Sequence, residues 1–249
     1  NKLELLNDAL LLWNYVLGKN NNHPPINNSL LNNDLLEKNS DVKTIYNDYY
    51  EFILTTGEKK IILIDNILKE DDINKITNNN KNLLLHVYIS KKCLKIDNNC
   101  FKNCNNLTFI SYLNFDNNDK ILLESIEENA FENCKSMEEC KLLDKENNIT
   151  IIKKNAFINC EKLYEITLEK SKIKTIESYA FYNCKNLVNI VFPDTLDNIQ
   201  EYAFNKTNLT NIYFDNKIPT NLSSNIFDYS LPKNCCCYYN SKYVKFLDY

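Results

Sequence analysis

Residues 176–192 read IESYAFYNCKNLVNIVF, and this stretch decides the fold because versions of it recur along the chain. Further copies of its centre, Ala-Phe-x-Asn-Cys, lie at Cys100–Cys104, Ala130–Cys134, Ala156–Cys160, Ala203–Asn205 and, in worn form, Ile226–Phe227. The phenylalanines of the six copies occupy positions 101, 131, 157, 181, 204 and 227, at intervals of 30, 26, 24, 23 and 23 residues. A period of 23–30 residues is typical of a repeat architecture.

The residues around each phenylalanine repeat as well. An aliphatic residue stands five positions before it, at Ile96, Ile126, Ile152, Ile176, Ile199 and Leu222. After the cysteine comes Leu-x-x-Ile-x-apolar, as in Leu187, Ile190 and Phe192. The last two of these are two apart, so they point to one side of a short strand. This pattern predicts strands at 109–112, 140–142, 166–168, 190–192 and 212–214.

The alanine and cysteine of each copy are four positions apart, which predicts that they lie one above the other on a single turn of helix. The phenylalanine between them then fills the interior where the chain turns back. Because one coil cannot bury its own apolar edge, successive coils must stack. The sequence therefore predicts an α/β repeat solenoid with a short-strand parallel sheet along one side.

The repeat resembles the leucine-rich repeats of the BspA type, whose unit is roughly I-x-x-x-A-F-x-x-C-x-x-L-x-x-I-x-L-P. The resemblance covers about residues 93–239 in six registered copies. Cys100 and Ile226 replace the alanine, Cys140 replaces the strand isoleucine, and the first two units carry insertions. The resemblance implies an adhesion or receptor-type module that binds a protein partner, outside the cell or at its surface.

The composition of the 249-residue chain excludes several other classes of function. Its 44 Asn, 10 Cys, 2 Gly and 2 His, with no Arg, leave no Gly-rich phosphate loop and little material for histidine-based sites. The net charge of −4 and the missing Arg argue against a nucleic-acid partner. We therefore expect neither an enzyme nor a cofactor. The asparagine excess is interpreted as the mark of an AT-rich coding genome.

The region before the repeats is less regular. Apolar residues at helical spacing predict a helix over 3–17, ended by Gly18, and a short helix over 30–36. Residues 59–65 and 83–89 read as buried strands, and 67–76 as a helix. The opening run is too short and too polar to cross a membrane. We favour a helical cap followed by worn repeats, with an α/β cap as the alternative. The chain then divides into an N-terminal cap region (1–90), repeats (91–234) and a C-terminal cap (235–249).

The ten cysteines have two interpretations. Cys104, Cys134, Cys160 and Cys184 share one repeat position, and Cys140 occupies a strand position, so burial as small hydrophobes is favoured for these five. Bridges between coils, and a disulfide between Cys93 and Cys100, remain open because neighbouring coils lie within disulfide reach. Alternation along a strand at Cys235–Cys237 would bury one or two of its thiols. A zinc site from His86, Cys93, Cys100 and Cys104 is disfavoured because their spacing does not match such sites. Thiol catalysis is disfavoured because no third group that would activate a Cys–His pair is identified.

The outward positions of the predicted strands form the candidate partner-binding face, since a solenoid presents this surface repeatedly. They are Phe109, Ser111, Glu139, Lys141, Glu165, Thr167, Asn189, Val191, Asn211 and Tyr213. Leu113 and Leu143 are expected on the same face, at its edge. A protein partner is expected here, and a solvated face with scattered apolar residues is the bland alternative. An intracellular scaffold, or a cytoplasmic subunit of a larger assembly, is the second class of function.

Overall fold

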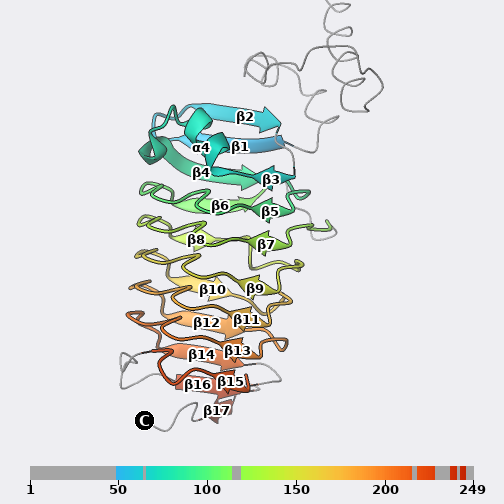
Figure 1. The fold of residues 1–249 in the computed structure, drawn as a ribbon, viewed down its shortest axis with the longest axis vertical. Helices are drawn as coiled ribbons and strands as arrows, with labels where there is room; N and C mark the ends of the chain where they lie inside the picture. Colours follow the sequence, from blue (N-terminus) through green and yellow to red (C-terminus); the bar gives the residue numbers. More distant parts are fainter. Residues whose placement is uncertain are drawn as a thin grey trace, which may run out of the picture.

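One coil of the repeat consists of a two-residue strand, a tight turn segment around the phenylalanine, a longer strand and a returning loop. In one such coil β11 (Thr175–Ile176) is followed by the turn segment 179–184 and by β12 (Asn189–Phe192). The computed structural model describes residues 49–63, 66–113, 119–214, 218–227, 236–239 and 242–244. Coils of this kind are stacked along most of that length (Figure 1).

The two-residue strands pair in parallel as one seven-stranded sheet, which we call the side sheet. In chain order its strands are β3 (Ile67–Leu68), β5 (Lys95–Ile96), β7 (Ser125–Ile126), β9 (Ile151–Ile152), β11, β13 (Asn198–Ile199) and β15 (Asn221–Leu222). Its inward residues from β5 onward are the aliphatic residues five positions before each phenylalanine. The single sheet that we predicted is thus accompanied by a second one.

The longer strands form a second row, which we call the front row, divided into two five-stranded sheets (Figure 1). The first has the order β2-β1-β4-β6-β8 and the second β10-β12-β14-β16-β17. Their bounds are β1 Tyr49–Leu54, β2 Lys59–Leu63, β4 Leu84–Ile89, β6 Phe109–Tyr112, β8 Glu139–Cys140, β10 Glu165–Thr167, β14 Asn211–Phe214, β16 Cys236–Tyr239 and β17 Lys242–Val244. The five predicted strands are confirmed: β6 has the predicted bounds, and the ends of the other four differ by at most two residues.

The repeated phenylalanines form one stacked column in the interior, as predicted. The ring centroids of Phe101, Phe131, Phe157, Phe181 and Phe204 are 5.1–5.2 Å apart in succession, and adjacent rings are inclined by at most 10°. Phe227 continues the column at 6.0 Å. All six side chains are at most 1% exposed. Each ring therefore packs its faces against the rings of the neighbouring coils, and the stack buries the apolar edge that a single coil would leave exposed.

The segment around each phenylalanine is a chain of turns, so the prediction of a helical turn was wrong. Within one copy, Ala130 N–H donates to Glu127 O at 3.2 Å and Cys134 N–H donates to Phe131 O at 3.1 Å. Other backbone groups bond to the next coil: Phe131 N–H donates to Ala156 O at 2.8 Å. A helix would have used these donors internally, whereas the turns present them to the neighbouring coil.

Asparagine supplies the backbone conformation that these turns require. Asn103, Asn133, Asn159 and Asn183 all have φ between 61° and 65°, in the left-handed region. Asparagine tolerates this region better than most residues other than glycine. The same side chains form a ladder, in which each Nδ2 donates to the Oδ1 of the previous coil at 2.7–2.8 Å. The asparagine excess therefore has a structural role that the genome interpretation did not assign.

The N-terminal end of the described solenoid is closed by strands, and a helical cap is not supported. The antiparallel hairpin β1–β2 adds to the front row next to β4. After β3 comes α4 (Glu70–Ile76), the only α-helix in the described part of the chain, followed by the 3₁₀ turn η2 (Lys81–Leu83). The helices expected over 3–17 and 30–36 lie outside the described residues. The division of the chain at residues 90 and 234 stays a prediction.

The described cysteines are all free, so the expected disulfides are not supported. These nine are Cys93, Cys100, Cys104, Cys134, Cys140, Cys160, Cys184, Cys236 and Cys237; Cys235 lies outside the described residues. Stacking does not aim the thiols at each other, because the Sγ of Cys134, Cys160 and Cys184 each donates to a phenylalanine carbonyl of the preceding coil at 3.2 Å. Burial as small hydrophobes is confirmed for the five repeat cysteines, which are at most 3% exposed.

Candidate binding face

The outward side of the front row is the candidate functional surface, and we call it the front face. All ten predicted residues have accessible side chains: Glu165 and Tyr213 are exposed, and the other eight are half-buried. Parallel pairing places equivalent positions side by side, with Thr167 next to Val191 and Val191 next to Tyr213. The structure therefore arranges most of the predicted residues in two columns that run across the coils.

Leu113 and Leu143 are not part of the front face, and their assignment to it was wrong. Leu113 is 8% exposed and Leu143 is fully buried. Leu113 lies one position after the end of β6, and Leu143 lies three positions after the end of β8. Alternation of side chains ends where the strand ends. The predicted face extended the alternation too far along the sequence.

Aromatic side chains gather where the front face meets the N-terminal hairpin. The Phe109 ring lies edge-on to Tyr88 at 5.8 Å and to His86 at 6.2 Å. Parallel pairing of β4 with β6 places His86 next to Phe109. Sequence reasoning named only Phe109 here, although the alternation over 84–89 could have identified His86 and Tyr88 as its neighbours. Edge-to-face aromatic pairs are typical of recognition surfaces as well as cores.

A charged cluster marks the seam between β8 and β10, where the front row divides. Tyr164 is 42% exposed and its Oη donates to Glu139 Oε1 at 2.7 Å across the seam. The Nζ of Lys141 lies 3.5 Å from Glu139 Oε2 and 3.3 Å from Asp144 Oδ2. The hydrogen bond to Glu139 raises the pKa of Tyr164. Partial burial lowers the pKa of Lys141, but the two carboxylates outweigh it and the net shift is upward.

The C-terminal part of the front face is mostly uncharged. Asn189 and Asn211 are paired in register, and the Asn211 Nδ2 donates to Asn189 Oδ1 at 2.8 Å. Val191 and Tyr213 form the neighbouring column, and Tyr213 is 37% exposed. The front face thus changes from aromatic to charged to amide along the stack.

Two further features of the described residues concern metal binding and thiol reactivity. Within the described ranges, no three His, Cys, Asp or Glu side chains come together as a metal site would need. Burial raises the pKa of the repeat thiols, to about 12 for Cys104 and Cys140, and a protonated buried thiol is a poor nucleophile. No helix among the described residues is long and apolar enough to cross a membrane.

Comparison with known proteins places this architecture in one family. Residues 36–121 and 110–234 match the model of the BspA type leucine rich repeat region, in six copies. A search of curated proteins returned no match.

Two solved structures resemble this chain, and the first of them shares its fold. The first is a leucine rich cell surface protein from Faecalibacterium prausnitzii A2-165, with 24% identity and a TM-score of 0.56 over 76% of this chain and 46% of that one. This chain therefore spans less than half of that protein. The second, a leucine-rich repeat protein from Bacteroides ovatus ATCC 8483, has 18% identity and a TM-score of 0.35 over 64% of this chain and 56% of that one.

Proposed function

This chain belongs to the BspA type leucine rich repeat family, and we propose that it is a non-catalytic module that binds another protein through its front face. The observation that carries the proposal is the in-register arrangement of exposed and half-buried side chains across successive coils. A rigid stack fixes the spacing of these side chains before a partner arrives. Preorganised surfaces lose less conformational entropy on binding.

The chemistry of the face indicates what a partner should present. Phe109, with Tyr88 and His86, offers an aromatic anchor of the kind that concentrates binding energy. Glu139 and Glu165 lie farther along the stack and favour basic groups on the partner. The paired amides of Asn189 and Asn211 offer hydrogen bonds beyond them. A partner that uses all three parts must lie along the solenoid axis.

We place this module outside the cell or at its surface, in an adhesion or receptor-type role. The support is the family itself and the solved Faecalibacterium prausnitzii protein, which is described as a cell surface protein.

The test is a set of charge substitutions along one column of the front face. Val191→Lys, Thr167→Lys and Tyr213→Lys each place a cation in the proposed contact without touching an inward residue. The matched control is Thr175→Lys, on the side sheet. With a purified partner identified by proximity labelling, we expect affinity losses of about tenfold or more for at least one front-face variant. If all three bind as tightly as the control, the front face is not the binding surface.

An intracellular scaffold, or a subunit of a larger assembly, is the second candidate. The free state of the nine described cysteines favours it, since exported proteins more often carry disulfides. Thiol titration of protein purified from its native cell, denatured without reductant, separates the two candidates. Ten free thiols favour the cytosol, and bridged cysteines favour export.

A further inference from the structure

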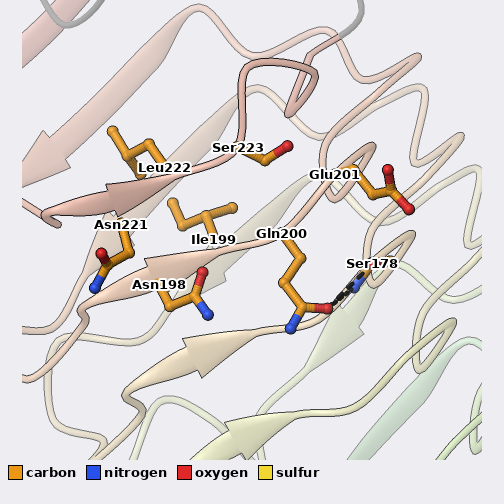
Figure 2. Close-up of a pocket in the computed structure, with 8 residues that line it drawn as sticks. All are labelled: Ser178, Asn198, Ile199, Gln200, Glu201, Asn221, Leu222 and Ser223. Atoms are coloured by element: carbon orange, nitrogen blue, oxygen red, sulfur yellow. Dashed lines mark hydrogen bonds between the residues drawn. The ribbon is translucent and has the colours of Figure 1, made fainter.

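The side sheet carries an open hollow of about 540 Å³ near the C-terminal end of the stack. The described residues that line it come from three successive coils, and Figure 2 shows all of them: Ser178, Asn198, Ile199, Gln200, Glu201, Asn221, Leu222 and Ser223. Asn198 and Asn221 are paired in register on β13 and β15, and their amides stand on the same side of the sheet (Figure 2). The hollow is separate from the front face.

The hollow forms where a repeated contact between coils stops. The Glu177 side chain accepts a hydrogen bond from the Lys154 N–H of the preceding coil, at 2.9 Å. One coil later, Gln200 Oε1 accepts from the N–H and the hydroxyl of Ser178, both at 3.1 Å (Figure 2). Ser223 holds the same position in the next coil, as the register of β13 with β15 shows.

A serine side chain is too short to continue this contact. The equivalent donor, the backbone N–H of Glu201, has no hydrogen-bond partner in the part of the chain that the structure describes. An unpaired backbone donor at a recessed site is a ready point of attachment for a ligand oxygen.

Side-chain amides around this donor also have hydrogen-bonding groups without a partner among the described residues. Elsewhere, stacked asparagines bond to each other, as Asn211 bonds to Asn189 at 2.8 Å. Asn198 and Asn221 form no such bond, and the Nε2 of Gln200 likewise has no partner among the described residues. The hollow therefore presents several donors and acceptors within one small area, beside the half-buried Leu222.

We propose that this hollow binds a neutral saccharide. Amides and a backbone N–H match hydroxyl groups, which both donate and accept hydrogen bonds. An anion is disfavoured because the lining contains the Glu201 carboxylate and no lysine. A purely apolar ligand would strip water from the amides without replacing their hydrogen bonds.

The test is calorimetric titration with di- to tetrasaccharides of glucose, galactose, mannose and N-acetylglucosamine. We expect at least one to bind with a dissociation constant of about 0.1–10 mM, which is common for a shallow polar site. Asn198→Ala and Asn221→Ala should each weaken binding about five- to tenfold, since each removes one hydrogen-bonding group. Neither side chain forms a hydrogen bond with another described residue, so the free energy of unfolding should stay unchanged.

Two further variants sharpen the result. Ser223→Gln restores the contact to Glu201 N–H and fills the hollow, so it should abolish saccharide binding while leaving the fold intact. Ser125→Ala, at the equivalent side-sheet position three coils before Asn198, should bind like the parent chain. The proposal fails if no saccharide binds at about 10 mM, if Ser223→Gln binds normally, or if only a peptide or an anion occupies the hollow. The front-face proposal is independent of each outcome.

Discussion

The central coils and the N-terminal unit satisfy their backbone hydrogen bonds and cover the interior of the stack in different ways. In the central coils, residues 125–214, every turn segment donates backbone hydrogen bonds to the next coil, as Phe157 N–H does to Ala180 O at 2.8 Å. In the N-terminal unit, residues 49–89, α4 occupies the place between β3 and β4 where the other coils have their turns. Its buried residues, Ile73 and Ile76, cover the interior that a phenylalanine covers elsewhere.

The difference lies in where the backbone groups of the turn region find their hydrogen-bond partners. In a central coil these donors and acceptors bond to the adjacent coils. In the N-terminal unit a helix satisfies them internally. The hairpin is hydrogen-bonded to this helix: Lys60 Nζ donates to Ile76 O, at the helix C-terminus, at 2.7 Å. The two regions thus depend on different interactions, which can be removed separately.

The largest expected effect is alkaline unfolding of the coils that follow the N-terminal unit. Six buried thiols, at Cys100, Cys104, Cys134, Cys140, Cys160 and Cys184, have their pKa raised above the ordinary 9.0 by burial. The unfolded chain releases these protons above pH 9 while the folded chain keeps them. Stability is therefore complete below pH 9 and falls as the pH rises towards 12, by about 1.4 kcal/mol per thiol and pH unit.

Between pH 8 and 10 we expect these six thiols together to cost roughly 8 kcal/mol of stability, measured by urea unfolding in the presence of reductant. The N-terminal unit contains no cysteine, so it contributes nothing through thiols. Cys160→Ala should reduce the slope with pH by about a sixth of its value. A free energy of unfolding that stays constant over this range would contradict the burial of these thiols.

The second effect concerns the aromatic column. Phe157→Ala or Phe181→Ala should lower the free energy of unfolding by about 3–5 kcal/mol, because each ring is stacked on both faces and the cavity has little freedom to collapse. Denaturant unfolding measures the loss. Phe157→Leu is the matched variant, and it should cost less because it fills part of the space. A loss below about 1 kcal/mol for the alanine variants would disprove the stacked-column assignment.

The smallest effect comes from replacing an asparagine by alanine in each of the two regions and comparing the loss of stability. Asn159→Ala should cost about 2 kcal/mol, because alanine is strained at φ 61° and loses the ladder. Asn159→Gly should cost about half as much, since glycine keeps the backbone conformation. Asn74→Ala, within α4, should be neutral or slightly stabilising because alanine favours helices. Equal costs for Asn159→Ala and Asn74→Ala in thermal unfolding would remove the distinction between the regions.

The sequence by itself determined the coil. Apolar residues two positions apart in each strand, and one phenylalanine in each period, indicate which side chains face inward. Every stacked coil must bury its apolar edge, so this pattern appears in the sequence. For that reason the interior column, the front strands and most of the front face could be predicted. The inward aliphatic residue five positions before each phenylalanine was also visible, although its strand was not recognised, because two residues are too few for alternation to appear.

The tertiary structure alone decided what happens between coils. The left-handed asparagines, the thiols that donate to carbonyls and the unpaired N–H of Glu201 all depend on which residue of one coil lies over which residue of the next. Loops of different length set that register, and a single sequence does not display it. The asparagine ladder was therefore interpreted as compositional bias. The hollow on the side sheet arises from one short side chain, Ser223, and no pattern in the sequence indicated it.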